Sequence, residues 1–522
     1  MPLSYLKKIR VIISLFFLII TLLLFVDLTN SIVSYLAEPV LFLQFIPSVF
    51  KIFTSIGLFS FGFLIVLITT LLFGRVYCST ICPFGVLQDI FSWLSKKINK
   101  KKRYKYSKQY NYLRYNLLRL SVLSLFFSTM FVINLLDPYS NFGRIAAQIF
   151  RPVYIFLNNI VASIFELFGS YAVSPILYKA VRLELLIFPV LMFLIVGYMA
   201  FKKGRLYCNT ICPVGALLGV ISKLSLYKIK IDLNNCKGCG ACERVCKAEC
   251  INSKEKSVDE TRCVNCYNCF IVCPTNGIKY QLSINSKIER KNTKISESKR
   301  KFVKDIGLFI MGTTIIAKAQ NKIKVYKENK IPTHKKNSVS PPGSKGIEHF
   351  TDFCTACNLC VSVCPTNVLQ PSFLEYGLLG ILQPHLDNSK GFCNFECNIC
   401  STVCPSGAIL PIKLEQKKIT QLGVAQFIED NCIVFAEKTD CGACSEHCPT
   451  KAVKMEPHEK LGKLVAPKVY KELCIGCGAC EHACPTKPYK AIFVEGNYIH
   501  KIAKRPIIEK QKAPISTEDF PF

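Results

Sequence analysis

Cysteine dominates the possible chemistry of this chain. The 522 residues include 29 cysteines, and most of these fall into runs with the spacing C-x2-C-x2-C-x3-C or a close variant of it. Disulfide frameworks occur mainly in small secreted proteins with loosely spaced cysteines. A rigid, repeated spacing is instead typical of iron–sulfur ligation by thiolates. The sequence therefore predicts about six [4Fe–4S] clusters, with iron as the metal.

Two of these runs lie close together in the middle of the chain. They are Cys236, Cys239, Cys242 and Cys246, followed by Cys263, Cys266, Cys269 and Cys273. In two-cluster ferredoxins the fourth cysteine of each run ligates the other cluster. We therefore assign Cys273 to the first triplet and Cys246 to the second. Lys247 stands where proline is usual, and Cys250 is left over and is interpreted as a packed thiol.

Four further runs follow residue 350. They are Cys354, Cys357, Cys360 and Cys364; Cys393, Cys397, Cys400 and Cys404; Cys432, Cys441, Cys444 and Cys448; and Cys474, Cys477, Cys480 and Cys484. The middle two are spacing variants, but every run still ends in Cys-Pro. Together they predict four clusters. The nesting that is usual in four-run electron-transfer subunits pairs the first run with the fourth and the second with the third, and we expect it here.

A shorter cysteine motif occurs twice in the apolar part of the chain. Residues 74–85 read GRVYCSTICPFG and residues 204–215 read GRLYCNTICPVG, which makes them an internal repeat. In a helix the two cysteines of each copy would lie on one side. Together, Cys78, Cys82, Cys208 and Cys212 could ligate a metal or cluster, or act as redox-active thiols. Simple packing of buried cysteines is the alternative.

The apolar residues are concentrated in the first 200 positions and predict four membrane-spanning helices. These are residues 11–26, 52–73, 120–136 and 185–201. Residues 145–169 contain charged side chains and a proline, and we interpret them as interfacial or re-entrant, with further partial spans as the alternative. Basic residues precede the first and third spans and follow the second and fourth. This pattern places both ends of the unit in the cytoplasm.

Haem has no ligands in this apolar part of the chain. All seven histidines lie at or after His334, and no C-x-x-C-H sequence occurs. These observations exclude a transmembrane b-type haem with histidine ligands and a c-type attachment site. We therefore expect electrons to travel through iron–sulfur clusters, thiols or a quinone.

The expected fold class combines these patterns. A membrane all-α unit, with four transmembrane helices in two related halves, is followed by two α+β domains of the bacterial-ferredoxin type. The expected boundaries are residues 1–222 for the transmembrane unit with both C-x3-C-P motifs, 223–282 for the two-cluster domain, 283–320 for a basic linker and 321–522 for the four-cluster domain.

The basic linker contains a segment that resembles an export signal. Residues 298–304 read SKRKFVK, which is similar to a twin-arginine motif with lysine in place of the first arginine. The uncharged residues 306–317 follow, and residues 317–319 have the small-x-small form of a cleavage site. We therefore expect the first cluster domain in the cytoplasm and the last in the periplasm. An apolar patch in a cytoplasmic linker is the alternative.

The net charge of +31 does not indicate nucleic-acid binding. Basic residues gather beside the apolar spans, as at Lys7, Lys8 and residues 96–105, which is typical of cytoplasmic membrane flanks. No nucleic-acid-binding motif accompanies the charge. The expected partners are membrane lipid, quinone or quinol, and a redox partner protein such as a reductase or a cytochrome.

The order of the motifs resembles known families. The membrane unit with two G-R-x-Y-C-x-T-I-C-P motifs, followed by two cysteine runs, resembles NapH-type membrane ferredoxins and is similar to the iron–sulfur part of NosR-type and CcoG-type proteins. From Lys299 onward, the twin-arginine-like start, residues 341–343 (PPG) and the four runs resemble NapG-type four-cluster proteins. The resemblance suggests a fusion of two subunits of a quinol dehydrogenase.

The resemblance also implies a function. NapH-type proteins hold cytoplasmic clusters at the inner membrane, NapG-type proteins face the periplasm, and together they pass electrons from quinol to a periplasmic reductase such as nitrate reductase. We expect a quinol-linked electron carrier. Arg75, Arg205 and the four motif cysteines are the candidates for residues near the place where quinol is oxidised. An assembly factor for another metalloenzyme and a carrier fed by ferredoxin are the alternatives.

Overall fold

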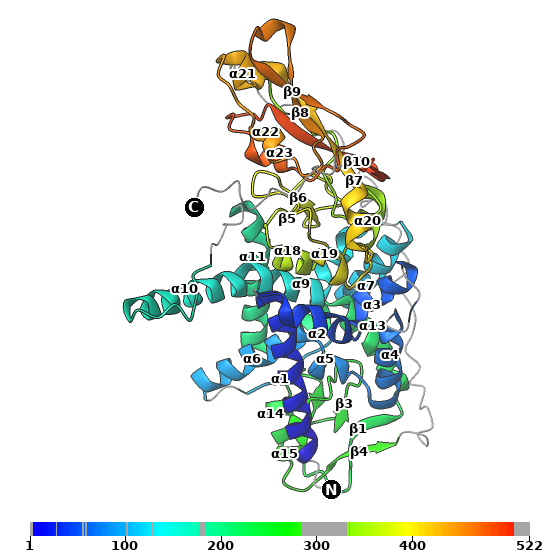
Figure 1. Cartoon of the computed structure of the whole chain (residues 1–522). Helices are drawn as coiled ribbons and strands as arrows, with labels where there is room; N and C mark the ends of the chain where they lie inside the picture. Colours follow the sequence, from blue (N-terminus) through cyan, green and yellow to red (C-terminus); the bar gives the residue numbers. More distant parts are fainter. Residues whose placement is uncertain are drawn as a thin grey trace.

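The molecule is arranged in three parts along one axis (Figure 1). The computed structural model describes residues 4–505, apart from residues 28, 55–56, 58–59, 101–102, 128, 177–182, 283–330 and 334. A helical unit (4–224) lies in the middle. The two-run domain (227–282) lies at one end of it and the four-run domain (331–505) at the other (Figure 1). The export signal expected at residues 298–319 lies outside the described residues.

Helices form nearly all of the described secondary structure of the first unit. They are α1 (Ser4–Val26), α2 (Ser31–Leu41), α3 (Phe45–Thr54), α4 (Gly62–Phe73), α5 (Tyr77–Thr80), α6 (Pro83–Ile98), α7 (Asn111–Phe126), α8 (Phe131–Leu136), α9 (Pro138–Ile145), the π-helical η2 (Ala146–Phe150), α10 (Arg151–Leu167), α11 (Leu183–Lys203), α12 (Leu206–Thr210), α13 (Pro213–Ile221) and the 3-10 turn η3 (Ser222–Leu224).

Three helices in the described residues are long and apolar enough to cross a membrane. They comprise residues 5–26 in α1, residues 138–167 in α9, η2 and α10, and residues 183–203 in α11. Helices α2 and α3 form a further apolar pair that is bent by 101°, as in a broken span or a re-entrant loop. The described part of the chain therefore holds three candidate spans, or four if the bent pair counts as one.

This arrangement corrects two of the expected spans and the interpretation of residues 145–169. Residues 52–73 do not form one helix, because α3 ends at Thr54 and α4 begins at Gly62. Residues 120–136 are divided between α7 and α8, where the Thr129 N–H donates to the Ser124 carbonyl and closes the end of α7. Residues 145–169 belong instead to a long apolar helix. Its proline lies just after the π-helical turn, at the start of α10, where the missing N–H is tolerated.

The two-run domain is built from short antiparallel ribbons and single-turn helices. Its elements are β1 (Tyr227–Ile231), α14 (Ala241–Val245), β2 (Ile251–Asn252), β3 (Ser257–Val258), α15 (Asn268–Val272) and β4 (Ile278–Leu282). Strand β1 pairs with β4, with Ile231 opposite Ile278, and β2 pairs with β3. Ile229, Ile251 and Phe270 fill a small core between the cysteine runs.

The four-run domain repeats this plan twice. Its elements are α17 (Ile347–Phe353), α18 (Leu359–Val363), β5 (Leu369–Pro371), β6 (Pro384–Leu386), α19 (Ile399–Thr402), α20 (Leu414–Ile419), β7 (Thr420–Phe427), η4 (Glu429–Asn431), α21 (Ile433–Ala436), α22 (Ala443–Glu446), β8 (Val453–Pro457), η5 (Glu459–Leu461), β9 (Val465–Val469), α23 (Ala479–Ala483) and β10 (Ile492–Ile502). Strand β7 pairs with β10, β5 with β6 and β8 with β9. Two separate buried cores lie behind these strands.

The two cysteine-rich domains contact opposite ends of the helical unit. Helix α1 touches α15 of the two-run domain and α18 of the four-run domain. Leu6, near its start, packs on the two-run core, and Asn30, beyond its end, donates to the Val363 carbonyl at 3.2 Å. The 23 residues of α1 correspond to about 35 Å at 1.5 Å per residue. This length is close to the thickness of a hydrocarbon core, about 30 Å.

Polar contacts fix the junction with the four-run domain. The Arg144 guanidinium donates to the Ala356 carbonyl at 3.3 Å, and the Asn134 amide can donate to the carbonyls of Cys354 and Thr355 at 3.1 and 3.2 Å. Because these acceptors belong to the first cysteine loop of that domain, the helical unit holds the loop by its backbone.

A buried carboxylate holds the opposite junction. Asp89 on α6 forms ion pairs with Arg10 of α1, with Arg205 at 2.8 Å and with Lys247 of the two-run domain at 3.3 Å. Burial alone would raise the pKa of Asp89, but the charges of Arg205, Lys247 and Arg10 hold this pKa well below its ordinary value. The ionised carboxylate therefore joins three segments of the chain.

Replacing Asp89 with asparagine should destabilise the protein, because three buried cations lose their counter-charge. Removing one partner of a buried ion pair costs about 3–5 kcal/mol. Differential scanning calorimetry in nanodiscs should show a lower melting temperature. The control is Glu396→Gln, which removes the exposed half of a surface ion pair and should change little. Equal melting temperatures for the two variants would contradict this role of Asp89.

Candidate iron–sulfur sites and the central cysteines

The structure places the fourth cysteine of each run of the two-run domain beside the triplet of the other run. Cys242 lies close enough to Cys236 and Cys273 to interact with both electrostatically, and Cys246 lies in the same way beside Cys269 and Cys266. The fourth cysteine of each run thus joins the triplet of the other run. This is the exchange that the spacing predicts for two clusters.

The four-run domain shows the same exchange between neighbouring runs. One small cavity is lined by Cys364 together with Cys393, Cys397 and Cys400, and another by Cys484 together with Cys432, Cys441 and Cys444. Cys404 lies beside the triplet of the first run, and Cys448 beside the triplet of the fourth. The first run therefore pairs with the second, and the third with the fourth.

The expected nesting of first run with fourth and second with third is therefore wrong. Each observed pair is enclosed in its own core, with Cys364 and Cys400 in one and Cys448 and Cys480 in the other. Runs that are neighbours in sequence are joined by short connections, and short loops are the easier ones to close.

The backbone of the regular loops directs N–H groups at the sulfur atoms. In four of the six runs, the residues two and four positions after the first cysteine have positive φ: Gly238 and Gly240, Asn265 and Tyr267, Ala356 and Asn358, and Gly476 and Gly478. The N–H of Ala356 donates to the Cys354 Sγ at 3.4 Å, and the N–H of Gly277 donates to the Cys273 Sγ at 3.2 Å. Such donors stabilise the negative charge of a ligated cluster.

These residues fit [4Fe–4S] clusters. Four cysteines line each of the two small cavities. Backbone N–H groups donate to the sulfur atoms of Cys354 and Cys448, which belong to the other two sets of this domain. Within the described residues, no three His, Cys, Asp or Glu side chains are close enough to share a single metal ion. In the two sets that line the small cavities, the four thiols surround a space, which is the arrangement that a polynuclear cluster requires.

The two C-x3-C-P motifs meet inside the helical unit. We call Cys78, Cys82, Cys208 and Cys212 the central cysteines. Each is 4% exposed, and each interacts electrostatically with others of the set. Cys82 and Cys212 are the N-cap residues of α6 and α13, and a proline follows each cap. Burial raises the pKa of the Cys82 and Cys212 thiols well above the ordinary value, whereas thiols used in exchange chemistry have a lowered pKa.

The two motif copies hold each other by equivalent contacts. Arg75 of the first copy donates to the Cys208 carbonyl at 3.2 Å, and Arg205 of the second donates to the Cys78 carbonyl. A Cβ atom at Gly85 would lie 2.3 Å from the Cys78 carbonyl oxygen, and one at Gly215 would lie equally close to that of Cys208. The glycine that ends each motif is therefore required by close backbone approach.

Positive charge is concentrated around the central cysteines. Arg75 is fully buried, lies 3.9 Å from the Cys78 Sγ, and also donates to the Thr261 carbonyl at 2.8 Å. Arg114 is 2% exposed and donates to the same carbonyl at 2.8 Å. Among the described residues neither arginine has a carboxylate partner within ion-pair distance. Buried cations of this kind require a nearby anion, and ligated thiolates would supply it.

One buried core connects the central cysteines with both cysteine-rich domains. It contains Cys78, Cys82 and Cys212 together with Cys357 of the four-run domain, and Cys266 of the two-run domain packs against it. Tyr139 belongs to this core and interacts electrostatically with Cys357. Candidate ligand cysteines from all three parts of the molecule therefore contact one buried core.

Several contributors were not identified from the sequence. Gln88 donates to the Cys208 Sγ at 3.1 Å, and Asp89 and Arg114 line the same region. The sequence contained one signal for these contacts: Lys247 follows the fourth cysteine of its run, where the other five runs have proline. The structure gives the reason: Lys247 binds Asp89, and its carbonyl accepts from the Arg205 N–H at 2.9 Å.

Comparisons with known proteins agree with this arrangement. A family model described as "4Fe-4S binding domain" matches residues 56–101 and 185–233, which contain the central cysteines. A second model with the same description matches residues 256–279 and 347–370, and a "4Fe-4S dicluster domain" model matches residues 439–487. No solved structure matches the chain.

Curated relatives match less than half of the chain. The ferredoxin-type protein NapH of Haemophilus influenzae is 28% identical over 226 residues, which cover 42% of this chain and 66% of the relative. This chain is related to the NapH-type ferredoxins. The methylamine utilization ferredoxin-type protein MauN of Methylobacillus flagellatus is 26% identical over 174 residues (33% and 48%), and the putative electron transport protein YccM of Escherichia coli is 24% identical over 209 (40% and 51%).

These findings confirm the predicted resemblance to NapH-type membrane ferredoxins with 4Fe–4S domains. The chain spans half to two thirds of the length of these three relatives. The protein is an iron–sulfur electron-transfer protein with apolar helices of the kind that cross membranes.

Cys250, which belongs to neither cysteine run, lies against the candidate ligand Cys246. Cys250 is 2% exposed, and its Sγ lies 3.5 Å from the Sγ of Cys246. When Cys246 is a thiolate ligand it can only accept a hydrogen bond, so the Cys250 thiol must be the donor.

Replacing Cys250 with alanine should lower the reduction potential of the cluster assigned to Cys246. A hydrogen bond to a ligand thiolate favours the reduced, more negative cluster. A net value of about 1 kcal/mol for the bond corresponds to about 40 mV for a one-electron couple. Redox titration monitored by EPR measures the midpoint. Cys250→Ser keeps a hydrogen-bond donor, so its midpoint potential should stay close to that of the wild type. An alanine variant whose midpoint potential is not shifted would disprove the effect.

Proposed function

We propose that this protein is a quinol-linked electron carrier of the cytoplasmic membrane. It passes electrons through [4Fe–4S] clusters between the two faces of the membrane and delivers them to a periplasmic reductase of the nitrate-reductase kind. The observation that carries the proposal is the single buried core, which contains the central cysteines and reaches candidate ligands of both cysteine-rich domains. Such a core is needed because electron transfer between clusters requires short paths that exclude solvent.

We propose six cluster sites, each with four cysteine ligands. The ligands would be Cys236, Cys239, Cys242 and Cys273; Cys263, Cys266, Cys269 and Cys246; Cys354, Cys357, Cys360 and Cys404; Cys393, Cys397, Cys400 and Cys364; Cys432, Cys441, Cys444 and Cys484; and Cys474, Cys477, Cys480 and Cys448. When bound, these clusters accept and release single electrons. The protein holds them, excludes water and donates N–H bonds to sulfur.

We propose that the central cysteines ligate a further cluster. The match of residues 56–101 and 185–233 to a 4Fe–4S binding domain supports this, because these segments contain no other cysteines than the central four. The buried charge of Arg75, which forms no ion pair with a carboxylate among the described residues, supports it further. In this arrangement Arg75, Gln88 and the N–H of Gly215 stabilise the sulfur atoms.

The proposed sidedness places the two-run domain in the cytoplasm and the four-run domain in the periplasm. The basic flanks of the apolar helices and the twin-arginine-like residues 298–304 support this orientation. So does the position of the described chain ends: Leu282 lies in the two-run domain and Ile331 in the four-run domain, at opposite ends of the helical unit (Figure 1).

A second function has one observation in its favour. Cys239 is the one exposed cysteine among those of the described chain, and it lies in the two-run domain. A cluster ligated there would be accessible to a small soluble protein, as in a carrier fed by ferredoxin. An assembly factor for another metalloenzyme would differ from both, since it would not oxidise quinol.

The relay is tested by reducing the purified protein with a quinol analogue and following the clusters by freeze-quench EPR. Clusters should become reduced in the wild-type protein. In Cys78→Ser, reduction of the two-run domain should slow at least tenfold, because the central site lies between the domains. Cys250→Ser is the control and should match the wild type. No reduction by quinol in the wild-type protein would contradict the quinol link, and unchanged kinetics in Cys78→Ser would remove the central cysteines from the path.

The sidedness is tested with single cysteines introduced at exposed positions. Lys463→Cys in the four-run domain should react with a membrane-impermeant maleimide in intact cells, whereas Glu255→Cys in the two-run domain should react only after lysis. Mass spectrometry of the labelled peptide separates both from the native thiols. Labelling of Lys463→Cys only after lysis would show that the four-run domain is cytoplasmic.

A further inference from the structure

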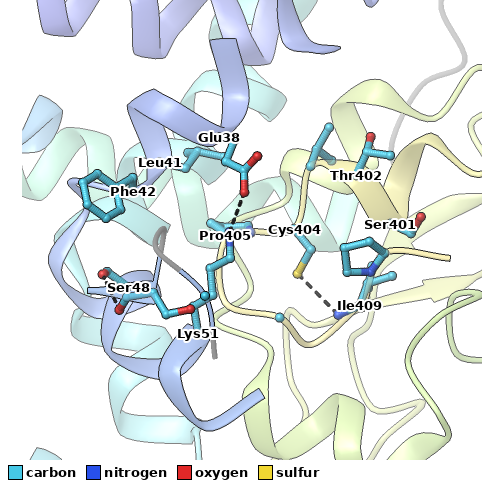
Figure 2. Close-up of a pocket in the computed structure, with 15 residues that line it drawn as sticks. Glu38, Leu41, Phe42, Ser48, Lys51, Ser401, Thr402, Cys404, Pro405 and Ile409 are labelled. Atoms are coloured by element: carbon cyan, nitrogen blue, oxygen red, sulfur yellow. Dashed lines mark hydrogen bonds and ion pairs between the residues drawn. The ribbon is translucent and has the colours of Figure 1, made fainter. Parts of the chain in front are cut away.

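A cavity lies where the helical unit meets the four-run domain (Figure 2). Its volume is about 360 Å³. One wall comes from α2 and α3, with Leu41 and Phe42 among its residues and with Gly57 and Ser60 beside them, and the other from the loop that carries Cys404 and Pro405. The two walls are tied together because the Thr54 hydroxyl donates to the Ser406 carbonyl at 3.2 Å.

The helices of the first wall have the character of a membrane-embedded hairpin. Helices α2 and α3 form an apolar pair that is bent by 101°. Tyr35 is 83% exposed and Phe53 is 72% exposed, which suits side chains that face lipid. A cavity behind such a hairpin can be entered from the bilayer, so its ligand is expected to be lipid-soluble. Ligand pockets typically measure about 300–1,000 Å³. The observed volume accommodates the aromatic ring of a lipid-soluble ligand together with part of its apolar tail.

One ion pair provides the charged groups of this cavity. The Lys51 ammonium lies 3.3 Å from the Glu38 carboxylate, and both residues line the cavity (Figure 2). The Glu38 side chain is 54% exposed and that of Lys51 is 22% exposed. A carboxylate can accept a proton from a bound hydroxyl group. The adjacent ammonium can stabilise the negative oxygen that this leaves behind.

The opposite wall carries a candidate cluster ligand. The Cys404 side chain lines the cavity, and its Sγ accepts a hydrogen bond from the Ile409 N–H at 3.4 Å (Figure 2). Cys404 is the residue that completes the set with Cys354, Cys357 and Cys360. An apolar cavity with a proton acceptor on one wall and an electron acceptor on the other has the parts that quinol oxidation requires.

We propose that this cavity is the quinol oxidation site, an inference that rests on the proposed function. Both O–H bonds of the quinol break and its two C–O bonds become the C=O bonds of quinone. Two protons leave, with Glu38 as the first acceptor and water at this face as the final one. The two electrons leave one at a time; a [4Fe–4S] cluster held through Cys404 would accept them and would pass them on through the other clusters to the partner. Lys51 orients the ring oxygen, and the quinone returns to the bilayer.

Occupancy is tested without turnover by photo-crosslinking an azidoquinone to the full-length protein in nanodiscs. Peptide mapping should place the crosslink on residues 38–60 or 401–411. Thr402→Trp adds a large side chain at the exposed rim of the cavity and should reduce this crosslink at least tenfold. Thr439→Trp, at an exposed position outside the cavity, should leave it unchanged. A crosslink elsewhere, or equal labelling in both variants, would overturn the proposal.

The proton acceptor is tested with Glu38→Gln. Quinol-dependent cluster reduction should slow at least tenfold, while crosslinking stays within threefold of the wild type. Glu166→Gln, which removes another exposed carboxylate of an apolar helix, is the control and should leave the rate unchanged. Equal rates in the two variants would remove Glu38 from the reaction.

These results separate the site from the proposed function. Rapid reduction of the wild-type protein by quinol, combined with a crosslink outside this cavity, would overturn the site and leave the function standing. Failure of quinol to reduce a wild-type protein whose clusters respond to dithionite would overturn both.

Discussion

Reciprocal hydrogen bonds of two buried arginines organise the helical unit. Arg75 and Arg205 each hold the backbone carbonyl of a cysteine in the other motif copy, and Arg205 also binds Asp89. Asp89 in turn holds α1 through Arg10 and the two-run domain through Lys247. Without these contacts the central cysteines would not converge, and the cysteine-rich domain at this end would lose its anchor. A few charged groups in a low-dielectric interior therefore position the whole redox centre. The attraction within each buried pair is strong, and leaving one of its charges unpaired costs free energy.

The 4Fe–4S domains could be predicted from the sequence because cluster ligation depends on local spacing. The exchange of Cys246 and Cys273 followed from the same rule. The pairing of the four later runs did not, because it depends on which runs share a core, and only the folded chain decides between Cys404 and Cys484 as the partner of the first triplet. The cavity could not be predicted either. Its walls join at the contact between Thr54 and Ser406, which are 352 residues apart.

The membrane helices were the least predictable part, for a related reason. Hydropathy identifies apolar residues but is insensitive to where a helix ends. The end of α3 before α4 and the end of α7 at Phe126 interrupt two apolar segments. The π-helical turn before Pro152 allows a third segment to continue. Hydrogen bonding of a few backbone groups, rather than apolar content, decides these outcomes.

Helix α1 acts as a rigid spacer between the two cysteine-rich domains, because it contacts both of them. A helix of fixed length cannot stretch when the surrounding bilayer thickens. In membranes of different thickness the protein must instead tilt, or the lipid around it must deform, as hydrophobic mismatch requires. The distances between redox sites are thereby insulated from lipid composition. Electron transfer, whose rate falls steeply with distance, would then proceed at the same rate in thin and thick bilayers.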